Sequence, residues 1–171
     1  MKIELKNLKY AEFASQETHC FEASLYVDGK RIGVVANDGR GGCNGYTPHT
    51  AWEIINEYAK TLPSKKYTMN VRNEDGTFTP NEVDLPADAD TVIDGLVVEA
   101  LYARDLKRAM TNKIMFINAD GEVMETTKMD KGTMMTWLSR PELMDKLKAT
   151  KVLNLMPLNE AVKLYRPQGA N

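Results

Sequence analysis

Residues 19–37 read H-C-F-E-A-S-L-Y-V-D-G-K-R-I-G-V-V-A-N. Apolar and polar side chains alternate on both sides of Asp28-Gly29, and this period of two is typical of β-strands. The Asp-Gly pair suits a two-residue turn in which both residues have positive φ angles. The stretch therefore predicts an antiparallel hairpin with strands over residues 19–27 and 30–37.

A regular two-residue turn also fixes the expected register of this hairpin. One face would then carry three cross-strand apolar pairs, namely Leu25 with Ile32, Ala23 with Val34, and Phe21 with Ala36. Because strand side chains alternate between two faces, we expect these six residues to be buried together. The same register places Cys20 opposite Asn37 and His19 opposite Asp38.

A glycine-rich loop follows the hairpin over residues 37–49, N-D-G-R-G-G-C-N-G-Y-T-P-H. A strand, a glycine-rich turn and a helix start form a layout that binds anions, because backbone N–H groups converge there. Arg40 could add a charged contact. The loop matches neither G-x-x-x-x-G-K-S/T nor G-x-G-x-x-G, so a surface turn that requires positive φ angles remains the alternative. The candidate ligand- or partner-binding residues are Asn37, Asp38, Gly39, Arg40, Gly41, Gly42, Asn44, Tyr46 and His49.

Periodicity and capping signals outline the remaining elements. They predict a strand over residues 2–10, a helix from Pro48 to Leu62 with Thr47 as its N-cap, a strand over 67–71, a turn over 73–76 followed by irregular chain to Pro86, a helix over 88–111, a hairpin around Asp120-Gly121, a helix over 134–148 split at Pro141, a strand over 151–156 and a helix over 157–165.

Two hairpins and three to four helices predict an α+β fold with antiparallel hairpins packed against the helices. A length of 171 residues fits a single domain over residues 1–171. Its first part, residues 1–63, would hold the hairpin, the loop and a helix. Its second part, residues 64–171, would hold the central helix, the second hairpin and the C-terminal helices.

The overall charge gives no sign of a nucleic-acid-binding protein. The chain has 22 basic and 24 acidic side chains and a net charge of −2, whereas non-specific binding to phosphate requires a surplus of positive charge. Two cysteines exclude a disulfide framework. No apolar run is long enough for a membrane span, and no signal peptide is recognisable, so we expect a cytoplasmic protein without membrane contact.

The histidines and cysteines are His19, Cys20, Cys43 and His49. Two thiolates and two imidazoles would suit tetrahedral zinc, but neighbouring strand residues point to opposite faces and no C-x-x-C pair is present. Cys43 beside His49 could act as a nucleophile, with Asp38 orienting His19. Such pairs are common by chance, so we assign no catalytic residue, metal or cofactor, and the choice between enzyme and non-enzyme stays open, with a non-enzyme favoured.

The segment Y-V-D-G-K-R-I-G-V-V-A-N-D-G-R-G-G-C-N-G-Y-T-P-H, residues 26–49, resembles the N-terminal signature of small uncharacterised proteins of bacteria, prophages and phages. In those proteins a D-G-K hairpin leads into an N-D/E-G-x-G-G loop and a Y-x-P. The resemblance covers residues 1–62 and transfers no catalytic residue. It implies an accessory role on a mobile element, and such proteins often block a host machine.

We therefore expect a non-catalytic protein that binds a host protein or complex in the host cytoplasm, as an inhibitor of a defence system of the anti-CRISPR or anti-restriction type. Exposed aromatic side chains and methionines would supply its contacts, unless they lie in the core. The alternative is a protein that binds or sequesters a nucleotide or another small anion at the loop over residues 37–49, or an enzyme that uses this loop.

Overall fold

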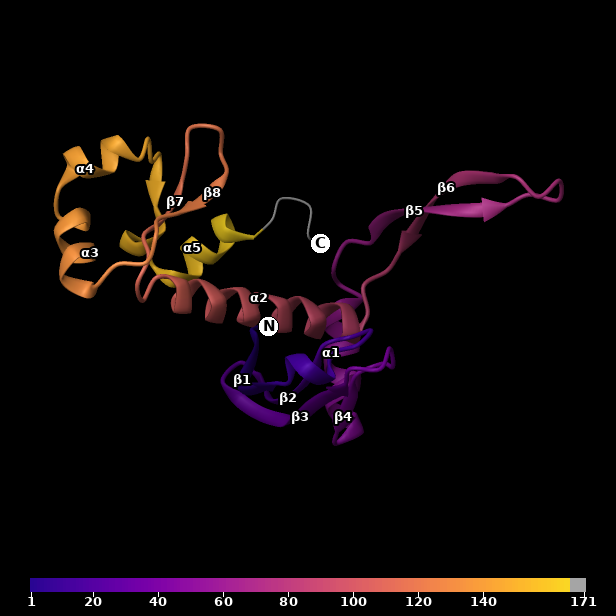
Figure 1. Ribbon diagram of the computed structural model, residues 1–171. Coiled ribbons are helices and arrows are strands. Elements are labelled where there is room, and N and C mark those ends of the chain that lie inside the picture. Colours follow the sequence, from indigo (N-terminus) through magenta and orange to yellow (C-terminus); the bar gives the residue numbers. More distant parts are fainter. Residues whose placement is uncertain (167–171) are drawn as a thin grey trace. The chain divides into compact units, whose positions relative to one another are not determined.

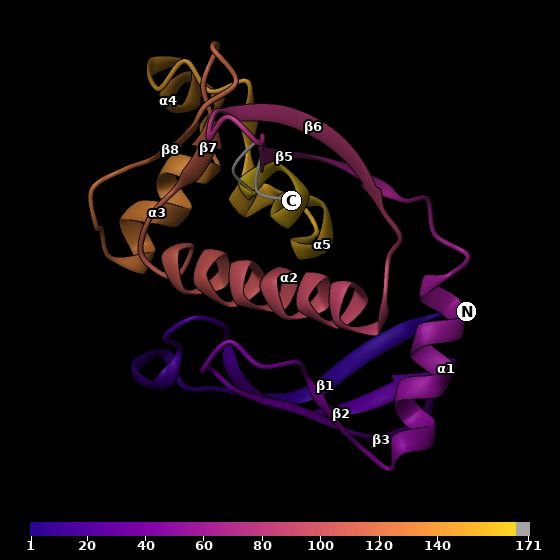
Figure 2. The same cartoon turned by 90° about the vertical axis from the view of Figure 1, so that its right-hand side faces the viewer.

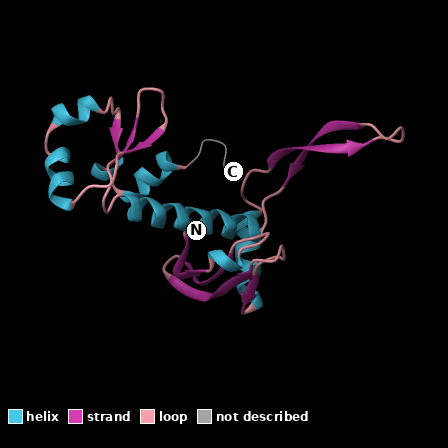
Figure 3. Ribbon diagram, in the orientation of Figure 1, coloured by secondary structure: helices cyan, strands magenta, loops and turns pink. Residues whose placement is uncertain are grey.

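The computed structural model describes residues 1–166. Helices and strands both occur, and every pair of neighbouring strands is antiparallel (Figures 1 and 3). The expected α+β class is confirmed, with five α-helices in place of three to four within this part of the chain. Contacts divide the chain into two compact units, the first over Met1–Val97 and the second from Val98 onward. The expectation of one domain stays a prediction.

A four-stranded sheet forms the centre of the first unit, in the order β1-β2-β3-β4. Its strands are β1 (Ile3–Tyr10), β2 (Cys20–Val27), β3 (Lys30–Asp38) and β4 (Gly45–Thr47), and a short 3-10 helix, η1 (Glu12–Ala14), joins β1 to β2. Asp28 and Gly29 have φ angles of 48° and 82°. The hairpin and its turn are therefore as predicted.

The register of this hairpin differs from the prediction. A bulge after Leu25 leaves Ile32 as an extra residue on β3, which moves every later side chain of β3 to the opposite face. The buried face of β3 is formed by Gly33, Val35 and Asn37, in place of Ile32, Val34 and Ala36. Phe21 consequently pairs with Asn37 and Cys20 with Asp38, so the predicted pairing of His19 with Asp38 is wrong.

Helix α1 (His49–Ala59) packs beside this sheet (Figure 2). Its buried residues Ala51, Ile55 and Ala59 belong to the predicted apolar stripe. The helix begins later than predicted, because Thr47 pairs in β4 and Pro48 takes the N-cap position. Gly33 makes the close approach possible, since a Cβ atom there would lie 2.5 Å from the Thr47 carbonyl oxygen and 3.2 Å from the Ala51 Cβ.

Two further strands, β5 (Lys65–Arg72) and β6 (Phe78–Leu85), form a separate two-stranded antiparallel sheet within the first unit (Figure 1). The prediction of irregular chain up to Pro86 is therefore wrong. Glu82, Asp84 and Pro80 hid the strand signal, because charged residues and proline are depleted in strands. We call the hairpin over Lys65–Leu85 the β-arm.

Helix α2 (Ala89–Ala109) crosses the boundary between the units. The second unit continues with β7 (Met115–Ile117), β8 (Val123–Glu125), α3 (Lys131–Leu138), α4 (Pro141–Lys146), β9 (Lys151–Val152), a 3-10 helix η2 (Leu153–Leu155) and α5 (Leu158–Tyr165). Strand β7 lies centrally, between β8 and β9, and is buried on both faces. The predicted split at Pro141 is confirmed, while the strand predicted over 151–156 ends at Val152.

Candidate functional site

The glycine-rich stretch over residues 37–49 contains the end of β3, a connection over residues 39–44 and all of β4, so the glycine turn does not open α1 directly. Three residues of β4 and Pro48 separate the connection over residues 39–44 from the first turn of the helix. An anion held by the loop would therefore gain little from the helix dipole, which acts within the first turn. This placement differs from the strand–loop–helix layout expected from the sequence.

The side-chain amide of Asn37 organises the loop from inside. Its Oδ1 accepts hydrogen bonds from Thr18 Oγ1 at 2.7 Å and from the Gly39 N–H at 2.8 Å. Its Nδ2 donates to the Gly42 carbonyl at 2.9 Å and to Asn44 Oδ1 at 3.0 Å. Asn37 and Asn44 are both buried. Because this amide uses both donors and both lone pairs inside the protein, the structure gives Asn37 a structural role.

Successive N–H groups of the loop also donate within the protein. Gly39 donates to Asn37, Arg40 to Asp38 Oδ1 at 3.1 Å, and Gly41 to Thr18 Oγ1 at 3.3 Å. An anion site needs such donors to be free and convergent. The small-anion hypothesis therefore stays a prediction that would have to rely on the exposed Arg40 side chain and on donors outside Gly39–Gly41.

The carbonyl of Gly39 holds the connection between β1 and β2 against the loop. It accepts hydrogen bonds from the backbone N–H groups of Gln16, Glu17 and Thr18, at 2.9, 3.0 and 3.3 Å. Gly39 has a φ angle of 84°, and a Cβ atom there would lie 2.2 Å from the Ala14 carbonyl oxygen. Only glycine fits at position 39 without a backbone shift. The sequence alone did not reveal this requirement.

The end of the loop is fixed to α2 by two acidic side chains. Asn44 donates from its backbone N–H to Asp90 Oδ2 at 3.2 Å and from Nδ2 to Asp94 Oδ1 at 2.9 Å. The Tyr46 hydroxyl donates to Asp90 Oδ1 at 3.0 Å, and burial together with the Asp90 carboxylate raises the pKa of Tyr46. Tyr46 is therefore half-buried and hydrogen-bonded to α2, and its place among the partner-binding candidates stays a prediction.

The carboxyl groups of Asp94, which lies in α2, and of Asp88, which directly precedes α2, should affect stability with opposite dependence on pH. Desolvation raises the pKa of Asp94, with a contribution from Asp90, although its residue is exposed overall. Hydrogen bonds from Thr91 lower the pKa of Asp88. Asp94 therefore favours folding below its unfolded pKa and loses that contribution as pH rises through its folded pKa, whereas Asp88 favours folding above its unfolded pKa.

We expect Asp94→Asn to raise the melting temperature at pH 7 and Asp88→Asn to lower it, by small amounts because both residues are exposed. The effect of Asp94→Asn should shrink as the pH falls through the raised pKa of Asp94, whereas the effect of Asp88→Asn should persist until the pH falls below about 4, through the lowered pKa of Asp88. Melting curves of the two variants and the wild type between pH 3 and 7 measure this. Shifts of the same sign in both variants would contradict it.

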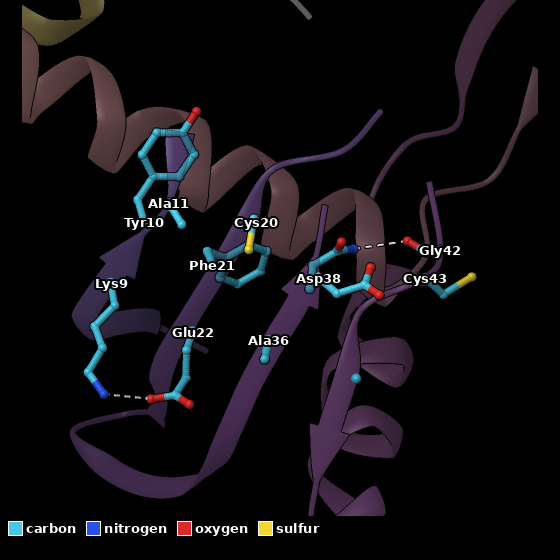
Figure 4. Close-up of a pocket in the computed structure, with 12 residues that line it drawn as sticks. Lys9, Tyr10, Ala11, Cys20, Phe21, Glu22, Ala36, Asp38, Gly42 and Cys43 are labelled. Atoms are coloured by element: carbon cyan, nitrogen blue, oxygen red, sulfur yellow. Dashed lines mark hydrogen bonds and ion pairs between the residues drawn. The ribbon is translucent and has the colours of Figure 1, made fainter. Parts of the chain in front are cut away.

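The histidines and cysteines do not form a common site. His49 lies 3.5 Å from Glu53 through Nδ1 and packs against Trp52, whereas His19 packs against Tyr10. Both cysteines are free thiols, and in Figure 4 the Cys43 side chain points away from Cys20. Across residues 1–166 no group of three or more histidine, cysteine or acidic side chains is arranged to hold a metal ion.

A shallow pocket of about 650 Å³ lies beside the loop (Figure 4). Its lining comes from the ends of β1, β2 and β3 and from the loop, and includes Tyr10, Cys20, Ala36, Gly42 and Cys43. Lys9 and Glu22 form an ion pair of 2.9 Å beside it. Of the residues proposed for binding, Asp38, Arg40, Gly41, Gly42 and His49 are exposed, whereas Asn37, Gly39 and Asn44 are buried.

The β-arm is a second candidate site, and sequence reasoning missed it. All eight residues of β5 and seven of the eight in β6 are exposed. One face carries Tyr67, Met69 and Val71 from β5 and Leu85 from β6, with exposed fractions of 41% to 52%. The alternation of Tyr67, Met69 and Val71 was visible in the sequence, but its partner strand was not.

Comparisons of the chain with protein-family models, with curated proteins and with solved structures gave no match. None of the helices in the described part of the chain combines the length and hydrophobicity that a membrane crossing requires.

Proposed function

We propose that this protein is a non-catalytic binding protein that acts by occupying a surface of another protein. The observation that supports this most strongly is the apolar face of the β-arm, whose four large side chains remain exposed. Exposed apolar surfaces rimmed by polar residues are characteristic of protein interaction sites. Tyrosine and methionine are also enriched in the cores of interfaces.

The charges of the β-arm favour a protein partner over a nucleic acid. The segment Lys65–Leu85 carries three basic side chains and four acidic ones, the basic ones being Lys65, Lys66 and Arg72. A β-ribbon that enters a nucleic-acid groove needs an excess of positive charge to neutralise phosphates. The β-arm has no such excess.

The biological setting that we propose follows the resemblance of residues 26–49 to phage and prophage proteins. In that setting the protein acts in the host cytoplasm and blocks a defence protein, as anti-CRISPR or anti-restriction inhibitors do. Inhibition by occupation predicts a complex of fixed stoichiometry and no turnover. It places the contacts on the apolar face of the β-arm, with the exposed part of the glycine-rich loop as a further contact region.

Variants of the two faces of the β-arm test this proposal. We expect Met69→Lys to abolish the complex that the protein forms in cells of its natural host, because a charge would be buried without a partner in the interface. Asp84→Lys puts the same charge on the opposite face of the β-arm, on β6, and should leave the complex intact. Native mass spectrometry of the gently purified protein measures the mass and stoichiometry of each complex.

A photo-crosslinking amino acid at position 69 or 84 identifies the contacted face in the cell. The partner protein should crosslink from position 69 and not from position 84. Equal capture of the partner by Met69→Lys and Asp84→Lys would rule out the β-arm as the binding surface. A bound species with the mass of a small molecule would instead favour the ligand-binding alternative.

A further inference from the structure

The two outer edges of the β-arm are not equivalent. Strand β6 contains Pro80, opposite Asn70, and proline has no N–H to donate to an added strand. Strand β5 has neither a proline nor a bulge over its eight residues. One edge of the β-arm is therefore interrupted, while the other presents a continuous row of backbone donors and acceptors.

The register shows which groups lie on the open edge. At the turn, the Asn73 N–H donates to the Thr77 carbonyl at 2.8 Å, so Asn73 and Thr77 form a hydrogen-bonded pair. Hydrogen-bonded and non-hydrogen-bonded pairs alternate along an antiparallel ladder. Asn70 and Pro80 therefore form a non-hydrogen-bonded pair, whose backbone groups point away from the partner strand, toward the outer edges of the β-arm. The outward-facing backbone groups of β5 accordingly belong to Lys66, Thr68, Asn70 and Arg72.

This open edge contrasts with the edge of the other sheet in the first unit. Strand β1 is protected by an irregularity between Lys6 and Lys9 and by Asn7, whose φ angle is 55°. Bulges and lysines are common means of preventing strand addition. A two-stranded sheet without further packing is only marginally stable in water, so an added strand on β5 would stabilise the β-arm.

Charge is separated along β5 and the turn in a way that suits pairing with β5 of a second copy. Lys65 and Lys66 lie at the base of the arm and Glu74 and Asp75 at its tip, while on β6 Glu82 forms an ion pair of 3.8 Å with Lys66 within the arm. Hydrogen bonds from Thr77 lower the pKa of Asp75, which keeps the tip negatively charged. When two arms lie antiparallel about a two-fold axis, the base of each lies beside the tip of the other.

We propose that the β5 edge binds the β5 edge of a second copy of this chain, which gives a four-stranded sheet in the order β6-β5-β5-β6. A register centred on Asn70 places Lys66 of one copy beside Glu74 of the other. A register centred on Met69 would instead pair Lys66 with Arg72 of the second copy, and like charges opposite each other are destabilising.

The area of the β-arm supports edge pairing over packing of two apolar faces. A two-stranded ribbon of eight-residue strands is about 27 Å long and roughly 10 Å wide, so one face covers on the order of 270 Å². A stable interface buries about 800 Å² on each partner. Edge pairing adds backbone hydrogen bonds that do not depend on this area, and it joins two apolar faces into one of twice the size.

Prolines at two matched positions test the pairing. Thr68→Pro removes an outward N–H from β5, and Glu82→Pro removes the N–H directly across from it on β6. We expect the wild-type protein to sediment as a dimer, Thr68→Pro as a monomer, and Glu82→Pro as a dimer. Sedimentation equilibrium over a range of protein concentrations measures this, and circular dichroism checks that both variants keep their strand content.

If Thr68→Pro unfolds the arm, an exchange of the charges at positions 66 and 74 tests the pairing instead. Lys66→Glu and Glu74→Lys should each weaken the dimer by roughly 2- to 30-fold, the effect of two symmetry-related exposed ion pairs. The combined variant should restore the wild-type dissociation constant. A monomeric wild type, equal effects of the two prolines, or no restoration would overturn the proposal. A monomer whose β5 edge binds only another protein would do so as well.

Discussion

Gly39→Ala should lower the free energy of unfolding of the first unit by about 2–4 kcal/mol, from the strain of a positive φ angle and from overpacking. A Cβ atom at Gly39 would lie 2.2 Å from the Ala14 carbonyl oxygen and 2.9 Å from the Cys20 Cβ. The nearer of these atoms belongs to the backbone, which a rotamer change cannot move away. Relief of the clash would disturb the hydrogen bonds from Gln16, Glu17 and Thr18 to the Gly39 carbonyl.

Gly29→Ala is the matched control for this substitution. Gly29 has a φ angle of 82°, close to the 84° of Gly39, but no atom lies within 4 Å of its would-be Cβ. We therefore expect Gly29→Ala to lose only the backbone term, about 1–2 kcal/mol. The difference between the two variants measures the contact between the loop and the β1–β2 connection.

Urea unfolding followed by the fluorescence of Trp52 reports on the first unit, provided that Trp137→Phe is introduced as a common background. The chain contains these two tryptophans and no others. Equal losses for Gly39→Ala and Gly29→Ala would show that the Ala14 contact contributes nothing.

Asn37→Asp should be about as damaging as Gly39→Ala, although it changes one side-chain atom. The substitution replaces the Nδ2 donor with an oxygen that faces the Gly42 carbonyl and Asn44 Oδ1. The buried Asn44 side chain and the partly buried Gly42 carbonyl then lose their donor, at about 1–3 kcal/mol for each unsatisfied group. We expect a loss of about 2–4 kcal/mol at pH 7, and a smaller loss in acid, where the new carboxyl group is protonated and can donate once.

The control for this prediction is Asp38→Asn, one residue further on. Asp38 is exposed and accepts one hydrogen bond within the loop, from the Arg40 N–H. An amide oxygen can accept the same bond, so the change should stay within about 0.5 kcal/mol. The same tryptophan-based unfolding curves, recorded at pH 7 and pH 4, compare both variants. A large effect of Asp38→Asn would mean that the surface of the loop, and not its buried amide, maintains its conformation.

Local chemistry made much of the fold predictable. The Asp28-Gly29 turn, the split at Pro141 and the apolar stripe of α1 follow from backbone preferences and from side chains that lie close in sequence. The register of the first hairpin was not predictable in this way. The bulge at Ile32 brings Gly33 under α1, where it lies next to Ala51, and this choice depends on a helix that comes later in the chain.

The candidate sites were predictable only in part. The glycine-rich loop was found because glycines are visible in a sequence, but its interior depends on Thr18, Asp90 and Asp94, which are distant in the chain. The β-arm was missed because strand β6 is polar and contains Pro80. A strand that is not buried does not need the apolar alternation by which strands are recognised.

Pro80 has a consequence for how far any assembly of this protein can grow. Strands with two competent edges can add copies without limit, and such growth ends in fibres. In the β-arm, each copy that joins through β5 leaves only the interrupted β6 edge at the outside. Under the proposed pairing, assembly closes after one addition, so the assemblies of this protein remain finite although β5 has an unprotected edge.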